Sequence, residues 1–242
     1  MIWNQPHLLL RCLRALLADA GAATEIVLVD NGSAALTRRL LARLDGFVTI
    51  ANPANAGFLR GCNQGAAAAR GRQLLLLNSD AFVRPGALAG ALAVLDDDPG
   101  VGAVGGRLIL PNGRLQEAGC IVWSDGATSG RCRGLPPNAE AASRRQDVDY
   151  CSGAFLMTPK SAWDRLGGFD EVFAPGYYEE SDYCLRLRDA GLRVVFEPGV
   201  AADHVQFGSQ ARRGDAMRLS ERNRVTFLAR HAERLRSAPP RP

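Results

Sequence analysis

The sequence contains no apolar run of about 18 residues, and this absence argues against a membrane-spanning helix. Its first residues, MIWNQPHLLLR, lack the basic region, the long apolar core and the small-residue cleavage site of a signal peptide. The six cysteines are scattered and form no C-x-x-C pair, so neither disulfides nor a zinc site is expected. We therefore expect a globular protein of the cytoplasm with reduced thiols.

The glycine motifs that bind phosphates in many nucleotide-dependent enzymes are also missing. Neither G-x-G-x-x-G nor a Walker A sequence occurs, and GAVGG at 102–106 has the wrong spacing.

The positive charge is concentrated at the end of the chain. Residues 211–242 contain nine arginines and three acids, a local net charge of about +6. Because the net charge of the whole chain is +4, the net charge of residues 1–210 is about −2. A nucleic-acid-binding protein would carry its basic excess on the main domain beside stacking aromatic residues, so no nucleic acid partner is expected.

What the sequence does contain is an alternation of strand-like and helix-like segments. Apolar runs predict strands at 25–30, 47–51, 73–80 and 101–106, and the segments between them predict helices. This alternation is typical of an α/β protein whose mostly parallel, Rossmann-like sheet has helices on both faces.

The second half of the chain predicts shorter elements and one long helix. Residues 124–148 are rich in turn-forming residues and predict a loop, whereas Thr158 and Pro159 predict the capped start of a short helix. We assign residues 1–210 to one domain and residues 211–242 to a basic amphipathic helix with a tail. Two interpretations of this helix stay open. It could lie against anionic lipid head groups, or it could pack on the domain with a solvated arginine face, which we favour.

Two predicted strands end in an aspartate, namely Asp30 after EIVLV and Asp80 after QLLLLNS. Ligands of open α/β sheets bind at the carboxyl ends of the strands. An aspartate there could hydrogen-bond a base or a ribose, or hold a divalent cation beside phosphates. Each aspartate could equally cap the helix that follows it. The two positions alone favour neither role.

The segment ANAGFLRGCNQGAAAARG at 54–71 lies between these two aspartates. Gly57 would let the chain approach a ligand closely, and Asn55 and Asn63 offer amide hydrogen bonds. A tightly packed helix start explains the same residues, and on its own it is the better interpretation.

The densest polar cluster, GYYEESDYCLRLRDAG at 176–191, has three acids in the first turn of a predicted helix. Glu179, Glu180 and Asp182 would complement the helix dipole, but three acids behind two tyrosines exceed what capping requires. A carboxylate there, facing a cation or a phosphate, could act as a general base. His204 follows a strand-like stretch, and a single histidine is more often structural than a ligand.

Taken together, these segments resemble the family 2 glycosyltransferases. The resemblance rests on VDNGS, NAGFLRGCNQGAAAARG, LLLLNSDAFVRPGAL, NGRLQEAG, DYCSGAFLMTP, LGGFDE and YYEESDYCLRLRDAGLRVVFEP, which occur in order up to about residue 209. The nearest subgroup comprises bacterial enzymes that build O-antigen and other surface polysaccharides, including rhamnosyltransferase-like members. The resemblance implies a GT-A fold and inverting transfer of a sugar from a UDP-, GDP- or dTDP-linked donor. The implied acceptor is a hydroxyl of a glycan or of a lipid-linked molecule.

The resemblance also implies a role for each candidate residue. Glu180 is the expected catalytic base, with Glu179 and Asp182 as the next candidates. Asp80 and His204 would bind a divalent cation, either Mg²⁺ or Mn²⁺. The expected nucleotide-sugar site comprises Asp30, Asn31, Asn55, Gly57, Asn63, Asn78, Ser79 and Asp80.

The sequence departs from the family pattern at three places. Asn78 replaces the first acid of the D-x-D motif, and position 180 is Glu where Asp is usual. Relatives begin with an apolar strand, whereas this chain opens at the last residues of that strand, MIWNQP, so we expect a truncated domain that lacks its first strand. Two alternatives to the enzyme stay open. They are a sugar-1-phosphate nucleotidyltransferase and a truncated, non-catalytic domain that binds nucleotide sugars. We expect a cytoplasmic location, with peripheral contact at the inner face of the plasma membrane as an alternative.

Overall fold

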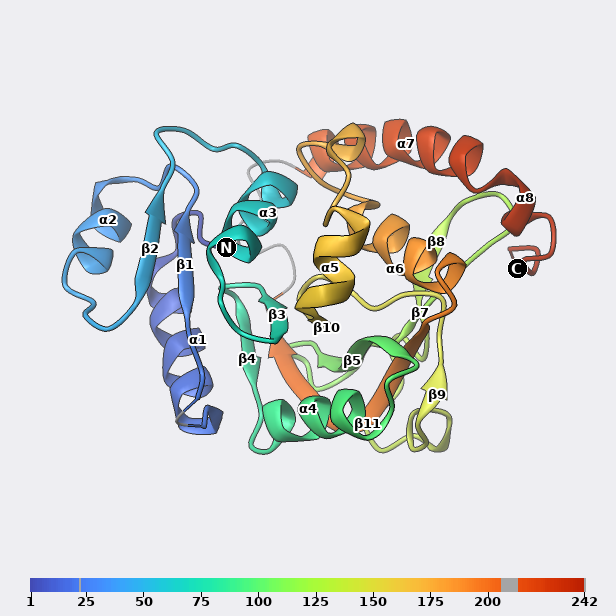
Figure 1. Ribbon diagram of the computed structural model, residues 1–242, viewed down its shortest axis with the longest axis horizontal. Helices are drawn as coiled ribbons and strands as arrows, with labels where there is room; N and C mark the ends of the chain where they lie inside the picture. Colours follow the sequence, from blue (N-terminus) through green and yellow to red (C-terminus); the bar gives the residue numbers. More distant parts are fainter. Residues whose placement is uncertain (22, 206–212, 242) are drawn as a thin grey trace.

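A computed structural model describes residues 1–21, 23–205 and 213–241 of the protein (Figure 1). Helices and strands alternate from the first residues, as the apolar periodicity predicts. The first half comprises α1 (Pro6–Asp19), β1 (Val27–Asp30), α2 (Ala35–Leu41), β2 (Val48–Ala51), α3 (Phe58–Ala68), β3 (Gln73–Leu77), β4 (Ala81–Val83), α4 (Ala87–Asp97) and β5 (Val101–Ile109). The second half comprises β6 (Leu115–Ala118), β7 (Cys120–Val122), β8 (Thr128–Gly130), η1 (Glu140–Ala142), β9 (Gln146–Asp147), β10 (Phe155–Pro159), α5 (Lys160–Leu166), η2 (Glu171–Phe173), α6 (Glu179–Asp189), β11 (Arg193–His204), α7 (Arg213–Arg230) and α8 (Ala232–Leu235).

The larger sheet has the strand order β3-β10-β5-β11-β4, with β6 beside β5 and β9 beside β11. β10 runs antiparallel to β3 and β5, while β11 runs parallel to β5 and antiparallel to β4. Strands β3, β5 and β11 therefore point in one direction, which confirms the predicted parallel arrangement for them. β10 and β4 run against these three, because each follows a turn or a loop rather than a crossover helix.

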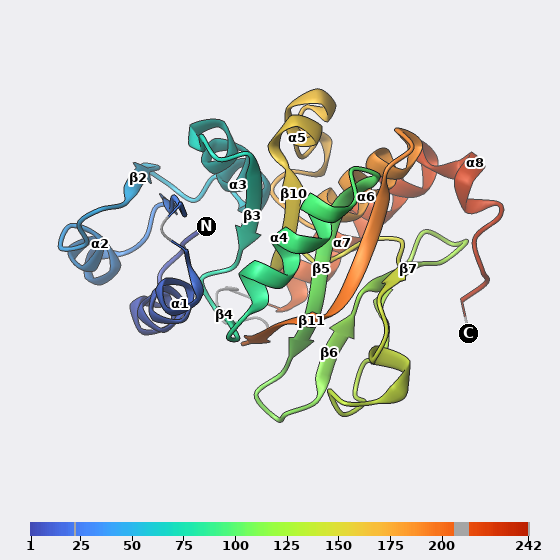
Figure 2. The ribbon, with the colours of Figure 1, turned by 60° about the horizontal axis from the view of Figure 1, so that its bottom comes forward.

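Helices cover both faces of this sheet (Figure 2). α4 packs on β5, β10 and β11 from one side, and α5 and α6 pack from the other. The leucines of β3 enter both layers: Leu74 and Leu76 join the core beside α5 and α6, whereas Leu75 and Leu77 pack toward the core beside α4. A strand that is covered on both faces is apolar throughout, which explains the four consecutive leucines.

The first two residues lie between the two parts of the molecule. β1 and β2 form a separate parallel pair, and the N-terminus sits between this pair and the larger sheet (Figure 1). The amide of Ile2 donates to the carbonyl oxygen of Val29 over 2.8 Å, and the terminal amine of Met1 donates to that of Leu77 over 3.4 Å. Ile2 is 1% exposed, so the junction of the two sheets is closely packed.

Two local predictions are wrong. Thr158 does not cap α5, because it belongs to β10 and its hydroxyl donates to the carbonyl oxygen of Gly102 over 2.6 Å. Residues 124–148 are not a single loop, because they contain β8 and β9, which pair with β7 and β11. The pairing of β9 depends on a strand far away in the sequence, which turn-rich composition does not reveal.

Helices α7 and α8 pack along α6 and the loop that precedes it (Figure 1). Phe227 of α7 is fully buried, and its ring centroid lies 5.0 Å from that of Tyr178. Arg230 contacts Asp170 at 2.8 Å. The favoured interpretation of a packed helix agrees with these contacts. The interpretation of a solvated arginine face is corrected for Arg230 and Arg234, which pair with acids of the domain and are about one-third exposed.

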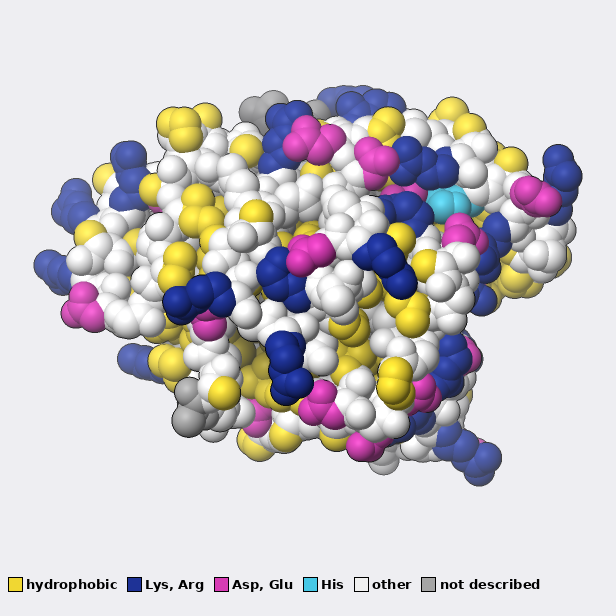
Figure 3. Space-filling view, viewed as in Figure 1, with side chains coloured by type: hydrophobic (Ala, Val, Ile, Leu, Met, Phe, Trp, Pro, Cys, Tyr) yellow, Lys and Arg dark blue, Asp and Glu magenta, His cyan; other side chains and the backbone are white. Residues whose placement is uncertain are grey.

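On the face shown in Figure 3, basic side chains lie among acidic ones, and no large patch carries a single sign of charge. No helix in the described ranges has both the length and the apolar character needed to cross a membrane. The predicted boundary at residues 210–211 lies outside the described residues.

Candidate active site

The end of β11 and the turn after β3 bring Asp80 and His204 together. That turn leads into β4, which pairs with β11 so that Ala81 lies opposite His204. Asp80 Oδ1 lies 3.4 Å from His204 Nε2, and both side chains are buried. Asn78 Nδ2 also lies 3.4 Å from this nitrogen, and Ser79 occupies the turn between Asn78 and Asp80. A strand rather than a helix follows Asp80, so the helix-cap explanation of this residue is excluded.

Gln116 and Glu117 of the buried strand β6 extend this cluster. Gln116 Oε1 lies 2.8 Å from His204 Nδ1, and Gln116 Nε2 donates to Glu117 Oε2 over 3.4 Å. Neither residue is predicted from the sequence. The available signal is a Gln-Glu pair between apolar neighbours in a strand whose every residue is buried, since buried polar side chains need partners.

The first turn of α6 carries Glu179 and Glu180. Burial, with a further contribution from the charge of Glu117, raises the pKa of Glu180 from 4.5 to about 7, although backbone hydrogen bonds oppose this rise. Burial and the charge of Glu180 raise the pKa of Glu179 well above its ordinary value. Within the described part of the chain, the Oε2 atom of each residue is buried without a hydrogen-bond partner. Burial therefore favours the protonated form of both carboxyl groups, and Glu180 exchanges its proton near neutral pH.

The loop before β10 joins the acid pair to the cluster around His204. The amide of Ser152 donates to Glu117 Oε1 over 3.3 Å. The backbone of the next residue, Gly153, hydrogen-bonds to Glu180, and the charge of Glu117 also acts on Glu180. The acid pair, β6 and the ends of β3 and β11 therefore form one connected polar cluster.

Asp182, the third acid of α6, belongs to a different network. Its Oδ2 accepts from Arg186 over 2.7 Å, while its Oδ1 accepts from Arg230 over 3.1 Å and lies 2.9 Å from His231 Nε2. Although burial alone would raise the pKa of Asp182, the hydrogen bond with His231 and the nearby arginines lower it. The structure places Asp182 in the contact between α6 and the C-terminal helices and not with the acid pair, so its placement does not support a catalytic role.

Asp30 and Asn31 form a second group at the end of β1. Asp30 Oδ1 accepts from the amide of Ser33 over 3.0 Å, so it closes a turn and does not cap α2, which begins after Ala34. The side-chain nitrogen of Asn31 donates to Asn55 Oδ1 over 2.8 Å and to the carbonyl oxygen of residue 57 over 2.9 Å. Asn31 thus shapes the loop before α3.

Gly57 and Asn63 have clear structural roles. Gly57 has a φ of 91°, and a Cβ atom on it would lie 2.4 Å from the carbonyl oxygen of Pro175, so only glycine fits there. This contact sets the loop against the segment that leads into the acid pair. The amide of Asn63 donates to the carbonyl oxygen of Phe169 over 2.8 Å and accepts from its N–H over 3.0 Å. For Asn63, these contacts favour the packing interpretation.

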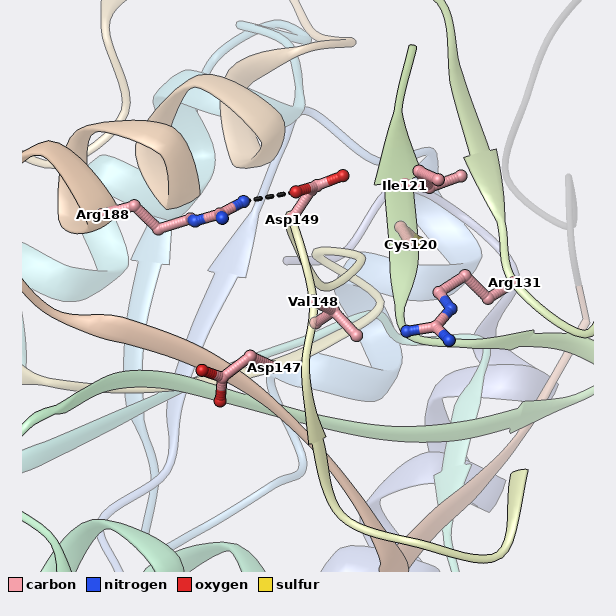
Figure 4. Close-up of a pocket in the computed structure, with 7 residues that line it drawn as sticks. All are labelled: Cys120, Ile121, Arg131, Asp147, Val148, Asp149 and Arg188. Carbon is pink, nitrogen blue, oxygen red and sulfur yellow. Dashed lines mark hydrogen bonds and ion pairs between the residues drawn. The ribbon is translucent and has the colours of Figure 1, made fainter. Parts of the chain in front are cut away.

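In the described ranges, no group of three or more His, Cys, Asp or Glu side chains is arranged to hold a metal ion. Asp80 and His204 together offer two possible metal ligands. A cavity of about 210 Å³ lies elsewhere, beside β7, and includes none of the candidate residues (Figure 4). It is lined by Cys120, Ile121, Arg131, Asp147, Val148, Asp149 and Arg188, with Arg188 paired to Asp149.

Comparison with known proteins identifies the family. Residues 1–162 match the model of glycosyl transferase family 2. The O-antigen biosynthesis protein RfbC of Myxococcus xanthus is 32% identical over 161 residues, which cover 64% of this chain and 12% of that protein. The rhamnosyltransferase WbbL of Escherichia coli K12 is 40% identical over 57 residues, or 24% of this chain and 21% of that protein. The chain thus spans less than a quarter of the length of these curated relatives.

The fold is also found among solved structures. The crystal structure of GalNAc-T7 with UDP, GalNAc and Mn²⁺ has a TM-score of 0.72 at 16% identity, and the match covers 91% of this chain and 45% of that chain. The fold and the polar cluster at the ends of its strands define a GT-A glycosyltransferase domain. The chain belongs to glycosyl transferase family 2, and it is similar to O-antigen and rhamnosyltransferase proteins, which confirms the expected resemblance.

Proposed function

We propose that this chain is the catalytic domain of an inverting glycosyltransferase. It moves a sugar from a nucleotide-diphosphate sugar to an acceptor hydroxyl in the biosynthesis of a surface polysaccharide or another cell-envelope glycan. One observation carries the proposal: β6 and the loop before β10 connect a carboxyl group whose pKa is about 7 to a pair of side chains suited to a cation. Membership of the family supports it, as does likeness to a protein whose structure holds UDP, GalNAc and Mn²⁺.

Glu180 is the proposed general base. A carboxyl group with a pKa of about 7 is largely ionised just above neutral pH and is basic enough to take the proton of the acceptor hydroxyl. Burial and the charge of Glu180 raise the pKa of the neighbouring Glu179 well above its ordinary value, which favours the protonated form of that second carboxyl group. The hydroxyl oxygen then attacks the anomeric carbon from the side opposite the leaving diphosphate. One carboxylate suffices, because the acceptor itself is the nucleophile.

Asp80 and His204 are the residues that would hold the divalent cation. A carboxylate oxygen suits Mg²⁺ or Mn²⁺, and an imidazole nitrogen suits the transition metal. Their 3.4 Å separation is short enough for both to bind one ion. The bound cation would neutralise the charge that develops on the leaving diphosphate. Asn78, which replaces an acid of the family motif, contributes no charge, and we expect weaker metal binding for this reason.

The nucleotide of the donor is proposed to lie along the end of β1. The bond from the Ser33 amide fixes the carboxylate of Asp30 at this strand end, where it would accept from a base or a ribose. Asn31 would contribute indirectly, because its side chain holds the loop that contains Asn55 and Gly57. Asn78 and Ser79 would lie beside the diphosphate, and Asn63 would act indirectly by docking α3.

Binding is tested by thermal unfolding of the full chain with UDP, GDP or dTDP, each with and without Mn²⁺. A nucleotide at 100 times its Kd adds about 2.7 kcal/mol to the free energy of unfolding. We expect one nucleotide to stabilise the chain more strongly with Mn²⁺ than without it, and Asp80→Asn to lose the contribution of Mn²⁺. Absence of stabilisation by all three nucleotides would overturn the proposed function.

Catalysis is tested with Glu180→Gln, which keeps the shape of the side chain but cannot take a proton. We expect transfer to fall by about 100-fold or more while nucleotide binding is retained. The matched control is Glu221→Gln on α7, because Glu221 is an exposed acid paired with Arg224. Transfer by Glu180→Gln at the wild-type rate would show that the base is another residue. Condensation of a sugar 1-phosphate with a nucleoside triphosphate would indicate the nucleotidyltransferase instead.

We further propose that residues 1–210 and 211–242 work as one packed unit in the cytoplasm. The contacts of Arg230 and His231 with Asp182 support this arrangement. Contact with the inner face of the plasma membrane is the less supported alternative, because these basic side chains face the protein. Binding of the full chain to vesicles of anionic lipid, absent from neutral vesicles, would favour that alternative.

A further inference from the structure

Gln116 contacts the side of the His204 ring that faces away from Asp80. Its Oε1 lies 2.8 Å from Nδ1, whereas Nε2 of the same ring faces Asp80 Oδ1 at 3.4 Å and Asn78 Nδ2 at 3.4 Å. Gln116 is 5% exposed and His204 is 6% exposed. Neighbouring side chains rather than bulk water therefore decide which ring nitrogen carries the proton.

Glu117 sets the orientation of the Gln116 amide. Gln116 Nε2 donates to Glu117 Oε2 over 3.4 Å, and the other oxygen of Glu117 accepts from the amide of Ser152 over 3.3 Å. Burial raises the pKa of Glu117, whereas hydrogen bonds from Cys120, Ser152 and Gln116 oppose this rise. The ionised form of Glu117 can only accept, so it selects the amide orientation with the nitrogen toward Glu117 and the oxygen toward His204. The Gln116 oxygen can only accept, so Nδ1 of His204 must carry the proton.

The contacts on the opposite side of the His204 ring, at Nε2, indicate the same Nδ1–H tautomer. Asn78 Nδ2 can only donate, so its approach to Nε2 requires a lone pair on that nitrogen. An unprotonated Nε2 and an oxygen of Asp80 then lie 3.4 Å apart in a buried site. Two acceptors that face each other without a proton between them are an arrangement suited to a cation.

We propose that Gln116 is a positioning residue that fixes His204 in its Nδ1–H tautomer and so presents Nε2 beside Asp80 as a cation ligand. The identity of this ligand set rests on the proposed function. Histidines that bind metals commonly donate their second N–H to an oxygen, which fixes the ring and its tautomer, and loss of that partner typically lowers metal affinity by about 10–100-fold.

The tautomer is measured by long-range ¹H–¹⁵N correlation in the full chain with ¹⁵N-labelled histidine. At about pH 8 an ordinary histidine is neutral, and single variants assign the signals because the chain has three histidines. We expect Nδ1–H for His204 in the wild type. In Gln116→Leu the proton should move toward Nε2, where it can be donated to Asp80. A wild-type Nε2–H tautomer, or an unchanged His204 in Gln116→Leu, would overturn the proposal.

His231 is an internal control for this measurement. Its Nε2 lies 2.9 Å from Asp182 Oδ1, in a contact that does not involve β6. Its signals should be the same in the wild type and in Gln116→Leu, which separates a local change at His204 from a loss of fold. If the variant does not fold, the wild-type tautomer alone still decides for or against the proposal.

Metal affinity provides a second readout. The affinity for Mn²⁺ alone, followed by electron paramagnetic resonance, should fall by about 10–100-fold in Gln116→Leu. Thr158→Val, which removes a buried hydroxyl from β10 in the same sheet, should bind Mn²⁺ as the wild type does. Equal affinities in Gln116→Leu and the wild type would contradict the role of Gln116. No binding by the wild type would count against the proposed function, and the tautomer, which needs no metal, would then decide the role of Gln116.

Discussion

Glu180→Gln is expected to stabilise the protein although it slows transfer by about 100-fold or more. Burial raises the pKa of Glu180 in the folded protein to about 7, whereas its ordinary value is 4.5. The folded state therefore binds more protons than the unfolded chain between these two values, and its stability falls as the pH rises through this window. At about 1.4 kcal/mol for each pH unit, the loss reaches about 3 kcal/mol above pH 7. Glutamine carries no charge, so the variant avoids this loss.

Urea unfolding at pH 5, 6, 7 and 8 measures the difference. The variant and the wild type should be similar at pH 5, and the variant should gain with each step until it is about 3 kcal/mol more stable at pH 8. Glu221→Gln should show no gain, because Glu221 is exposed and the hydrogen bond from Arg224 lowers its pKa. Equal stability of Glu180→Gln and the wild type at pH 8 would refute the reasoning, and so would a gain that does not depend on pH.

Three further predictions follow from the same contacts. Because Glu180 must be ionised, kcat/KM for transfer should fall about tenfold for each pH unit below about 7, and a flat profile would contradict its role as base. Asn223→Ala removes a buried amide that donates to three carbonyl oxygens of the loop before α6, so we expect about 3 kcal/mol less stability in urea and a lower kcat. Gly57→Ala would press a methyl group against Pro175 and should cost more than about 2 kcal/mol, whereas Gly21→Ala, with open space around its Cβ, should be nearly neutral.

Much of the fold could be predicted because helices and strands leave a local pattern of apolar residues in the sequence. The helix expected between the strands at 47–51 and 73–80 is Phe58–Ala68, and the one expected between 73–80 and 101–106 is Ala87–Asp97. Apolar periodicity records which face of a segment is buried, so it marks the element itself. The antiparallel direction of β10 and β4 could not be predicted, because it depends on partners far away in the chain.

The candidate site was harder to predict, since spacing alone does not say which polar side chains meet. Asp80, His204 and Glu180 were expected together only through the family resemblance, and their roles stay predictions. Glu180 and Asp182 lie two positions apart on one helix, and a rotation of about 100° per residue points them in different directions. The place of Gln116 between Glu117 and His204 could not be predicted, because it depends on the packing of β6.

The contacts of α7 and α8 determine how the C-terminal arginines can be studied. Removing the chain from Arg213 onward would take away Phe227, Arg230 and His231 together and leave the buried carboxylate of Asp182 with Arg186 as its remaining partner. A buried charge that loses partners costs about 3–5 kcal/mol, which approaches the whole stability of many domains. Loss of lipid binding in such a shortened chain would report unfolding rather than the loss of a membrane-binding surface. Charge reversals on the outward side of α7, in the full-length chain, avoid this ambiguity.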